Sequence, residues 1–142
     1  PGVVIPNSSV LFLAYTIPLD ISGISNLPGL YAETMIKAQQ SPNKLRATIE
    51  YIDESISALG RARIIRSDAD LIKEELQLTA NMLKHGAKRL LSAIDRSGIG
   101  KEDLLDEFRI ITATYRRPWL TRNRPGGLGD SLGHSLLTRV IL

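Results

Sequence analysis

The sequence predicts an all-α fold, an antiparallel up-and-down helical bundle preceded by an extended lead-in. Apolar residues recur at alternating spacings of three and four over three long segments, which is the period of one helix face. Short links join these segments, as expected for helices that run antiparallel to their neighbours. The chain has 142 residues. That length suits one domain with a core, and it is too short for a (β/α)8 barrel of roughly 200 residues or more.

Residues 1–29 are predicted to form the extended lead-in. Prolines, serines, asparagines and glycines interrupt every apolar patch in this stretch. The sequence begins at Pro1, without methionine and inside a loop-like segment, so we expect residues 1–29 to link the domain to an upstream part of a larger parent chain. Residues 30–142 are expected to form the helical bundle domain. Its first helix has one face made of Leu30, Tyr31, Thr34, Met35 and Ala38, and ends near residue 41.

The second helix is expected to begin at Ser41-Pro42, because serine is a good N-cap and proline suits the first helical position. Gly60 lies inside this helix and weakens it locally. Its stripe consists of Leu45, Ile49, Ile52, Ile56, Leu59 and Arg63. The third helix is expected to begin at Ser67-Asp68-Ala69-Asp70, which resembles a capping box. Its stripe consists of Ile72, Leu76, Thr79, Leu83, Ala87, Leu90 and Ile94.

The third helix is expected to end at Ser97-Gly98-Ile99-Gly100, where glycine suits a left-handed backbone. The fourth helix is predicted from about Lys101, and a last helix from Asp130 to the end of the chain. The stripe of the fourth helix consists of Leu104, Phe108, Ile111, Tyr115 and Trp119. Pro118 lies inside this helix, and because proline removes a backbone donor we expect it to kink or end the helix.

Composition excludes several classes of function. Net charge is only +3, so nucleic-acid binding through a broad basic surface is not indicated. There is no cysteine, which excludes disulfides, thiol catalysis and thiolate metal sites. No run approaches 18 apolar residues, so no membrane span is predicted. No basic segment precedes the first apolar patches, so no signal peptide is predicted, and a soluble cytoplasmic protein is favoured over a secreted one.

Titratable residues do not form a recognisable catalytic pattern. His85 lies off the main stripe of the third helix and is predicted at the surface or the bundle edge. His134 has no second ligand four residues on, so no zinc site is predicted. Pairs of acidic residues fall mostly opposite the apolar stripes, as solvated helix faces do. We therefore predict no catalytic residue, no metal site and no cofactor within this chain.

The most unusual segment is residues 115–131, called here the arginine corner. It contains Arg116, Arg117, Arg122 and Arg124, together with Trp119. Pro125 removes a donor and the two glycines after it permit positive φ, so an irregular backbone is expected. The candidate contact residues are Trp119, Arg122, Asn123, Arg124 and Asp130.

The arginine corner has three interpretations. In the first, Trp119 anchors the end of the bundle while the arginines cap carbonyls and pair with Asp130 or with acids at helix starts. In the second, the guanidinium groups meet carboxylates or sugar hydroxyls of a neighbouring domain. In the third, arginines and tryptophan stack on bases, although the basic density is confined to one corner. The residues alone leave all three open.

The same segment carries a resemblance to a known family. Tyr115, Trp119-Leu120, Arg122-Asn123-Arg124-Pro125-Gly126-Gly127-Leu128 and Asp130-Ser131 resemble the end of the C-terminal helical domain of bacterial family 20 glycoside hydrolases. These are exo-β-N-acetylhexosaminidases of the streptococcal three-domain type. Ile5-Pro6-Asn7-Ser8-Ser9, Tyr15 and Pro18-Leu19 are similar to the segment that leads from the barrel of those enzymes into the helical domain. Two departures are Thr16-Ile17-Pro18, where an aspartate precedes the proline in relatives, and Pro118 before Trp119.

The resemblance implies an accessory role. In that family an Asp-Glu pair on the barrel carries the chemistry, with glutamate as general acid and the substrate's acetamido group as nucleophile. That pair has no counterpart in this chain, whose acidic pairs lie on predicted helices. We therefore expect a non-catalytic domain that packs on the catalytic barrel of a parent enzyme acting on N-acetylhexosaminides, with a homodimer as a further expectation. The alternative is a freestanding interaction or nucleic-acid-binding module that uses residues 116–124.

Overall fold

The computed structural model describes residues 42–94 and 98–128. This part of the chain holds three α-helices, α3 (Pro42–Arg61), α4 (Ala69–Ile94) and α5 (Lys101–Arg122). A 3-10 turn, η2 (Pro125–Gly127), follows α5. The described residues contain no strand, so the predicted all-α class is confirmed. The predicted lead-in, the helix expected over residues 30–41 and the last helix, with Asp130 and His134, lie outside the described residues.

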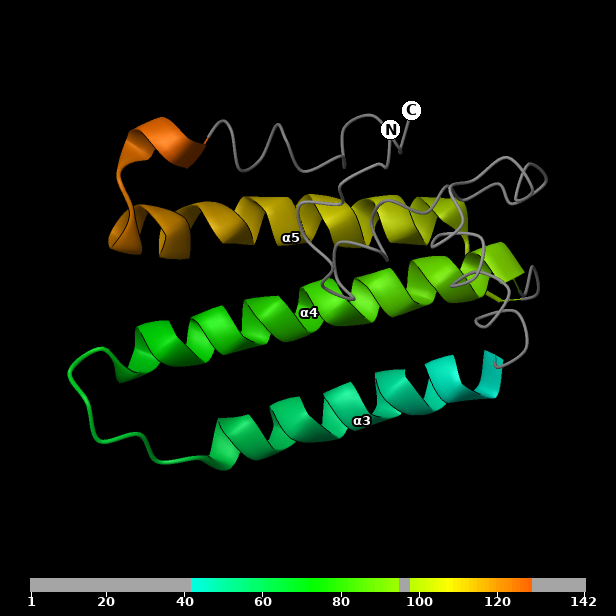
Figure 1. Cartoon of the computed structure of the whole chain (residues 1–142), viewed down its shortest axis with the longest axis horizontal. Helices are drawn as coiled ribbons and strands as arrows, with labels where there is room; N and C mark the ends of the chain where they lie inside the picture. The colour runs from blue at the N-terminus through cyan, green and yellow to red at the C-terminus, as the bar shows by residue number, and fades with distance from the viewer. Residues whose placement is uncertain (1–41, 95–97, 129–142) are drawn as a thin grey trace, which may run out of the picture.

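The three helices form an antiparallel array. Figure 1 shows α4 between α3 and α5, with the three axes close to parallel and each helix reversing the direction of the one before. Packing contacts join α3 to α4 and α4 to α5. Helix α4 therefore needs apolar side chains toward two neighbours, so its sequence carries apolar residues on two faces.

Helix α3 begins at Pro42, as predicted, and its apolar positions are half-buried. No residue of this helix is fully buried. Leu59 O accepts a backbone hydrogen bond of 3.0 Å from Ala62 N just after the helix ends. Arg63 lies beyond the end of the helix and is exposed, so its assignment to the stripe was wrong.

Helix α4 buries two faces, and the sequence stripe captured only one of them. On the predicted stripe Ala87 and Leu90 are buried, but Leu76 is 48% and Leu83 36% exposed, so the stripe is not buried along its whole length. A second face carries other buried residues. The fully buried positions of α4 are Leu78, His85, Gly86, Ala87, Arg89, Leu90, Leu91 and Ala93. Seven of the eight fully buried residues of α4 lie between residues 85 and 93, so this half of the helix is covered on nearly all sides.

Helix α5 begins at Lys101, as predicted, with Leu104 and Ile111 buried. Of the two outcomes expected at Pro118, a kink or an end of the helix, the end is not found, since α5 continues to Arg122. Pro118 is itself buried. Because proline has no backbone N–H, the helix lacks one hydrogen bond at this position. Burial of the ring offsets part of the cost that proline brings to a helix interior.

The glycines use ordinary backbone angles. None of the described glycines has a positive φ, so the left-handed backbone expected after the third helix and in the arginine corner is not found there. Gly100 instead has φ −68° and ψ 147° and serves as the N-cap of α5. A Cβ at Gly100 would lie 2.9 Å from Asp103 Oδ2, so a larger residue here would require the exposed Asp103 side chain to move.

Candidate functional site

Ion pairs link the end of α5 to the start of α4. Arg122 donates from Nε to Glu75 Oε1 at 2.9 Å and from Nη2 to Glu75 Oε2 at 3.1 Å, a bidentate arrangement. Arg122 Nη1 also lies 3.2 Å from Asp68 Oδ2. Arg117 pairs with Glu74. We call these five residues the arginine clamp. The first interpretation of the arginine corner includes pairs between its arginines and acids at helix starts, and Arg122 forms such a pair with Asp68.

The clamp shifts the ionisation of its own members. The hydrogen bond from Arg122 lowers the pKa of Glu75 below its usual range. The pKa of Asp68 is also lowered, chiefly by the hydrogen bond from Arg66, whose Nε lies 2.9 Å from Asp68 Oδ1. Glu75, followed by Asp68, raises the pKa of Arg122. All three groups thus stay charged near neutral pH, and the clamp acts as an electrostatic link rather than as an acid or a base.

A cleft of about 170 Å³ lies beside the clamp, between α4 and α5. We call it the Trp119 cleft. Its lining residues are Glu75, Leu78, Thr79, Met82, Tyr115, Pro118, Trp119, Arg122 and Asn123. The rings of Tyr115 and Trp119 stack, with centroids 5.6 Å apart and planes inclined by 28°. The indole Nε1 of Trp119 is buried and has no hydrogen-bond partner.

Asn123 closes the end of α5 over the cleft. Its backbone N donates to Trp119 O at 2.8 Å, and its side-chain Nδ2 donates to the same carbonyl at 3.2 Å. Both bonds satisfy a carbonyl that the helix end leaves without a partner. Asn123 is therefore a helix cap, which is a structural role.

The structure brings together three of the five candidate contact residues. Trp119, Arg122 and Asn123 line one cleft. Arg124 is exposed and lies outside that lining, while Asp130 lies outside the described residues. Arg116 and Arg124 form no ion pair among residues 42–94 and 98–128. The arginine corner therefore contains two arginines that pair with carboxylates of α4 and two that form no ion pair among the described residues.

A second polar cluster lies deeper in the same helix pair. His85 is 1% exposed, so its prediction as a surface or edge residue was wrong. Its Nδ1 lies 3.4 Å from Glu107 Oε2 of α5, and Glu107 also pairs with Lys88. The His85 ring packs against Phe108, with centroids 6.0 Å apart. We call these four residues the His85 layer. Its signal in the sequence is the spacing Leu71, Leu78, His85, which places His85 on the second apolar face of α4.

The protonation states of this layer follow from burial and charge. Burial lowers the pKa of His85, and the nearby Glu107 carboxylate only partly opposes this effect. Burial raises the pKa of Glu107, but Lys88 and His85 outweigh it and hold that pKa below its usual value. Because ionised Glu107 can only accept, Nδ1 of neutral His85 carries the proton. A neutral histidine donating to a carboxylate resembles a catalytic pair, but His85 is too enclosed to reach a substrate.

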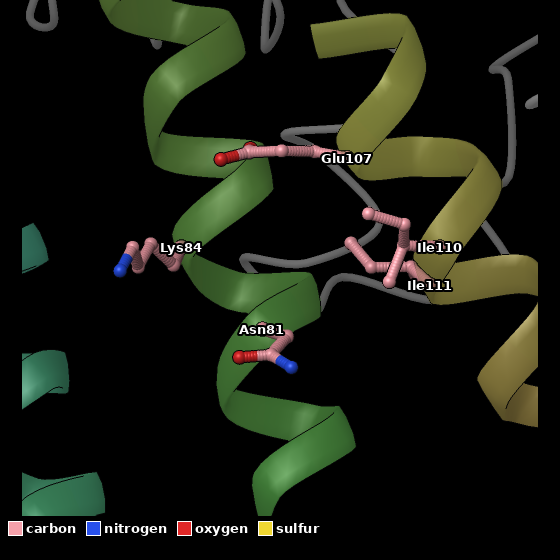
Figure 2. A pocket seen from close by; sticks show the side chains of 5 residues that line it. All are labelled: Asn81, Lys84, Glu107, Ile110 and Ile111. Carbon is pink, nitrogen blue, oxygen red and sulfur yellow. The ribbon is translucent and has the colours of Figure 1, made fainter. Parts of the chain in front are cut away.

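A second cavity, of about 200 Å³, opens next to the His85 layer and is lined by Asn81, Lys84, Glu107, Ile110 and Ile111. Figure 2 shows the Glu107 side chain extended from α5 toward α4, while Lys84 points away from α5. Lys84 pairs with Asp53 of α3. The charged groups at this cavity are therefore committed to links between helices.

The described residues hold no group of three histidine, aspartate or glutamate side chains close enough to share a metal ion. None of the described helices is long and apolar enough to span a membrane.

Comparisons with protein-family models, curated proteins and solved structures found no match to this chain.

Proposed function

We propose that this chain is a non-catalytic C-terminal helical domain of a β-N-acetylhexosaminidase-like glycoside hydrolase, and that it packs on the catalytic barrel of its parent enzyme. The residues that carry the resemblance to family 20 enzymes support this proposal. Arg122 reaches from α5 to two carboxylates at the start of α4, and Asn123 caps α5. Each has a structural task within the bundle, and this agrees with the role of an accessory domain.

The ionisable groups support a non-catalytic role in the same way. Glu74, Glu75 and Asp68 are paired with arginines, and Glu107 is paired with Lys88. A general acid needs an accessible carboxyl group with a raised pKa. The shifts described for Asp68, Glu75 and Glu107 go in the opposite direction.

The clamp also weakens the alternative of a nucleic-acid-binding module. Single-strand binding needs a broad cationic groove that follows the backbone, with aromatic faces free to stack. Arg117 and Arg122 already hold carboxylates, and the ring of Trp119 is stacked on Tyr115. Within the corner, Arg116 and Arg124 are the arginines that form no ion pair among the described residues, and they make a small basic surface for that task.

The proposal is tested by sequencing the gene upstream of the codon for Pro1. We expect a continuous reading frame that encodes a barrel-sized segment with an adjacent Asp-Glu pair. The encoded polypeptide should hydrolyse 4-nitrophenyl N-acetyl-β-D-glucosaminide, and replacement of that glutamate by glutamine should abolish turnover. A start codon immediately before Pro1, or an upstream segment of another kind, would contradict the proposal.

A further inference from the structure

The Trp119 cleft has the dimensions of an anchor pocket rather than of a pocket for a whole small-molecule ligand. Its volume is about 170 Å³. Pockets for drug-sized ligands enclose about 300–1,000 Å³, whereas a dry cavity of ~150 Å³ admits a molecule the size of benzene. One apolar side chain fits this space, and a complete hexose with its hydroxyls fits poorly. The size therefore favours a single side chain inserted by a protein partner.

The lining of the cleft suits an apolar side chain. Leu78 and Pro118 are buried in its walls, and Met82 adds a flexible thioether. The polar groups at its edge, Glu75 and Arg122, are bonded to each other. An incoming side chain therefore displaces no ion pair and gains apolar contact on several sides. Tryptophan and tyrosine are also the residue types that most often dominate the energy of protein interfaces.

Two exposed arginines are close in sequence to the α5 residues that line the cleft. Arg116 lies three residues before Trp119 and hence on a neighbouring part of the helix surface, and Arg124 directly follows Asn123. Both arginines are exposed, and neither pairs with a carboxylate in the described part of the chain. Exposed cations beside an apolar pocket attract a segment that carries carboxylates on either side of an apolar residue.

The indole of Trp119 adds a polar requirement. Its Nε1 is covered by protein and lacks an acceptor. A donor left in this state is costly, and a small turn of the ring toward the cleft would give it an acceptor if the occupant supplied a carbonyl. A peptide backbone provides that carbonyl next to its side chain.

We propose that the Trp119 cleft binds an acidic peptide segment of a partner protein. One apolar side chain of the segment fills the cleft, its carboxylates meet Arg116 and Arg124, and a backbone carbonyl accepts from Trp119 Nε1. The proposal concerns the chemistry of the segment, and it holds whether that segment belongs to a glycoside hydrolase barrel or to another protein.

The test uses the only tryptophan of the chain, which gives one indole N–H signal in a ¹⁵N-correlated NMR spectrum. The probes are two synthetic peptides, acetyl-Asp-Leu-Asp-amide and acetyl-Lys-Leu-Lys-amide, each titrated to millimolar concentration. We expect the acidic peptide to shift the indole signal saturably, and less so at high salt because exposed charges are screened. The basic peptide should leave the signal unchanged.

Two double variants distinguish the charge beside the cleft from the net charge of the whole protein as the cause of peptide binding. Arg116→Glu combined with Arg124→Glu should weaken binding of the acidic peptide by roughly tenfold or more, since the charges beside the cleft then repel it. Lys44→Glu combined with Lys101→Glu makes the same change in net charge at exposed first-turn positions of α3 and α5, and should leave binding unchanged. Trp119→Phe, followed through the Asn123 amide signal, should weaken binding several-fold because the N–H donor is lost.

Several results would overturn the proposal. They are no indole shift with the acidic peptide, equal shifts with both peptides, or equal weakening in the two charge variants. A saturable shift with N-acetylglucosamine alone would assign the cleft to a sugar. A shift that depends on protein concentration would assign it to a second copy of this chain. None of these results would decide whether a catalytic barrel is encoded upstream, so failure here is distinguishable from failure of the proposed function.

Discussion

The arginine clamp and the His85 layer both join α4 to α5, yet they hold the two helices by different means. Clamp members remain partly in solvent, with the Arg122 side chain 41% and that of Arg117 70% exposed. The His85 layer lies in the half of α4 that is covered on nearly all sides, where His85 is 1% exposed. Exposed ion pairs contribute little to stability, whereas buried apolar contacts contribute much. The segment most conspicuous in the sequence is therefore not the one on which most of the stability depends.

The largest effect should come from the buried half of α4. Leu91→Ala removes a side chain that is 6% exposed, and we expect it to lower the free energy of unfolding by about 2–5 kcal/mol. The matched control Leu76→Ala, at a position 48% exposed near the clamp, should cost below about 1 kcal/mol. Urea unfolding followed by circular dichroism measures both. Similar losses in the two variants would mean that the buried half of α4 contributes no more stability than the exposed position near the clamp.

Trp119→Ala should have the next largest effect. For a fully buried tryptophan the loss would be roughly 3–5 kcal/mol, but Trp119 is half-buried and lines a cleft, so we expect roughly 1.5–3 kcal/mol. Leu120→Ala, at an adjacent residue that is 37% exposed, is the control and should cost less. Calorimetric unfolding would measure both variants. An unchanged melting curve for Trp119→Ala would show that this ring does not anchor the bundle end.

The His85 layer should also make stability depend on pH. Burial lowers the pKa of His85 in the fold below its ordinary value of 6.5, so the unfolded chain binds more protons between those two values. Stability should be complete above about pH 6.5 and fall as the pH drops through that window, at up to about 1.4 kcal/mol per pH unit. Glu107, Asp68 and Glu75, whose pKa values are lowered, lose their contributions only at more acidic pH.

The unfolding midpoint in urea, measured from pH 8 to pH 5, tests this dependence. The wild-type midpoint should decrease toward pH 5, while that of His85→Gln should stay nearly level over the same range. Parallel curves for the two proteins would mean that His85 does not titrate differently in the folded and unfolded chains.

The clamp should show the smallest effect and the strongest dependence on salt. Arg122→Ala removes contacts with Glu75 and Asp68, but all three side chains remain partly in solvent, so the loss of stability should be smaller than for Leu91→Ala or Trp119→Ala. Arg122→Lys keeps the charge and loses the bidentate geometry, and should fall between wild type and alanine. The differences should shrink at high salt. A loss that persists in molar salt would contradict an electrostatic role.

Much of the fold could be predicted from local patterns. Alternating spacings of three and four located α3, α4 and α5, and proline and glycine marked the starts of α3 and α5. The core of α4 was harder, because a helix between two neighbours carries two apolar faces and a single stripe describes only one. His85 and Arg89 are polar residues on its covered surface, and residue type alone places both outside.

The candidate site was predicted in part. Residue types in the arginine corner indicated Trp119, Arg122 and Asn123, and the structure brings these three to one cleft. The partners of the arginines could not be assigned, since Glu74 and Glu75 lie more than forty residues away in the chain. Which arginine faces α4 and which faces solvent depends on how α5 is rotated against α4, and that rotation is set by packing along the whole helix pair.

We propose that this chain serves a catalytic domain and performs no catalysis itself. The most direct test of this proposal is the hydrolysis of 4-nitrophenyl N-acetyl-β-D-glucosaminide by the purified 142-residue chain, beside the product of the whole reading frame. We predict turnover by the product of the whole frame and none above background by the chain alone. Turnover by the chain alone that is lost in Glu107→Gln would contradict the account and make the His85 layer an active site.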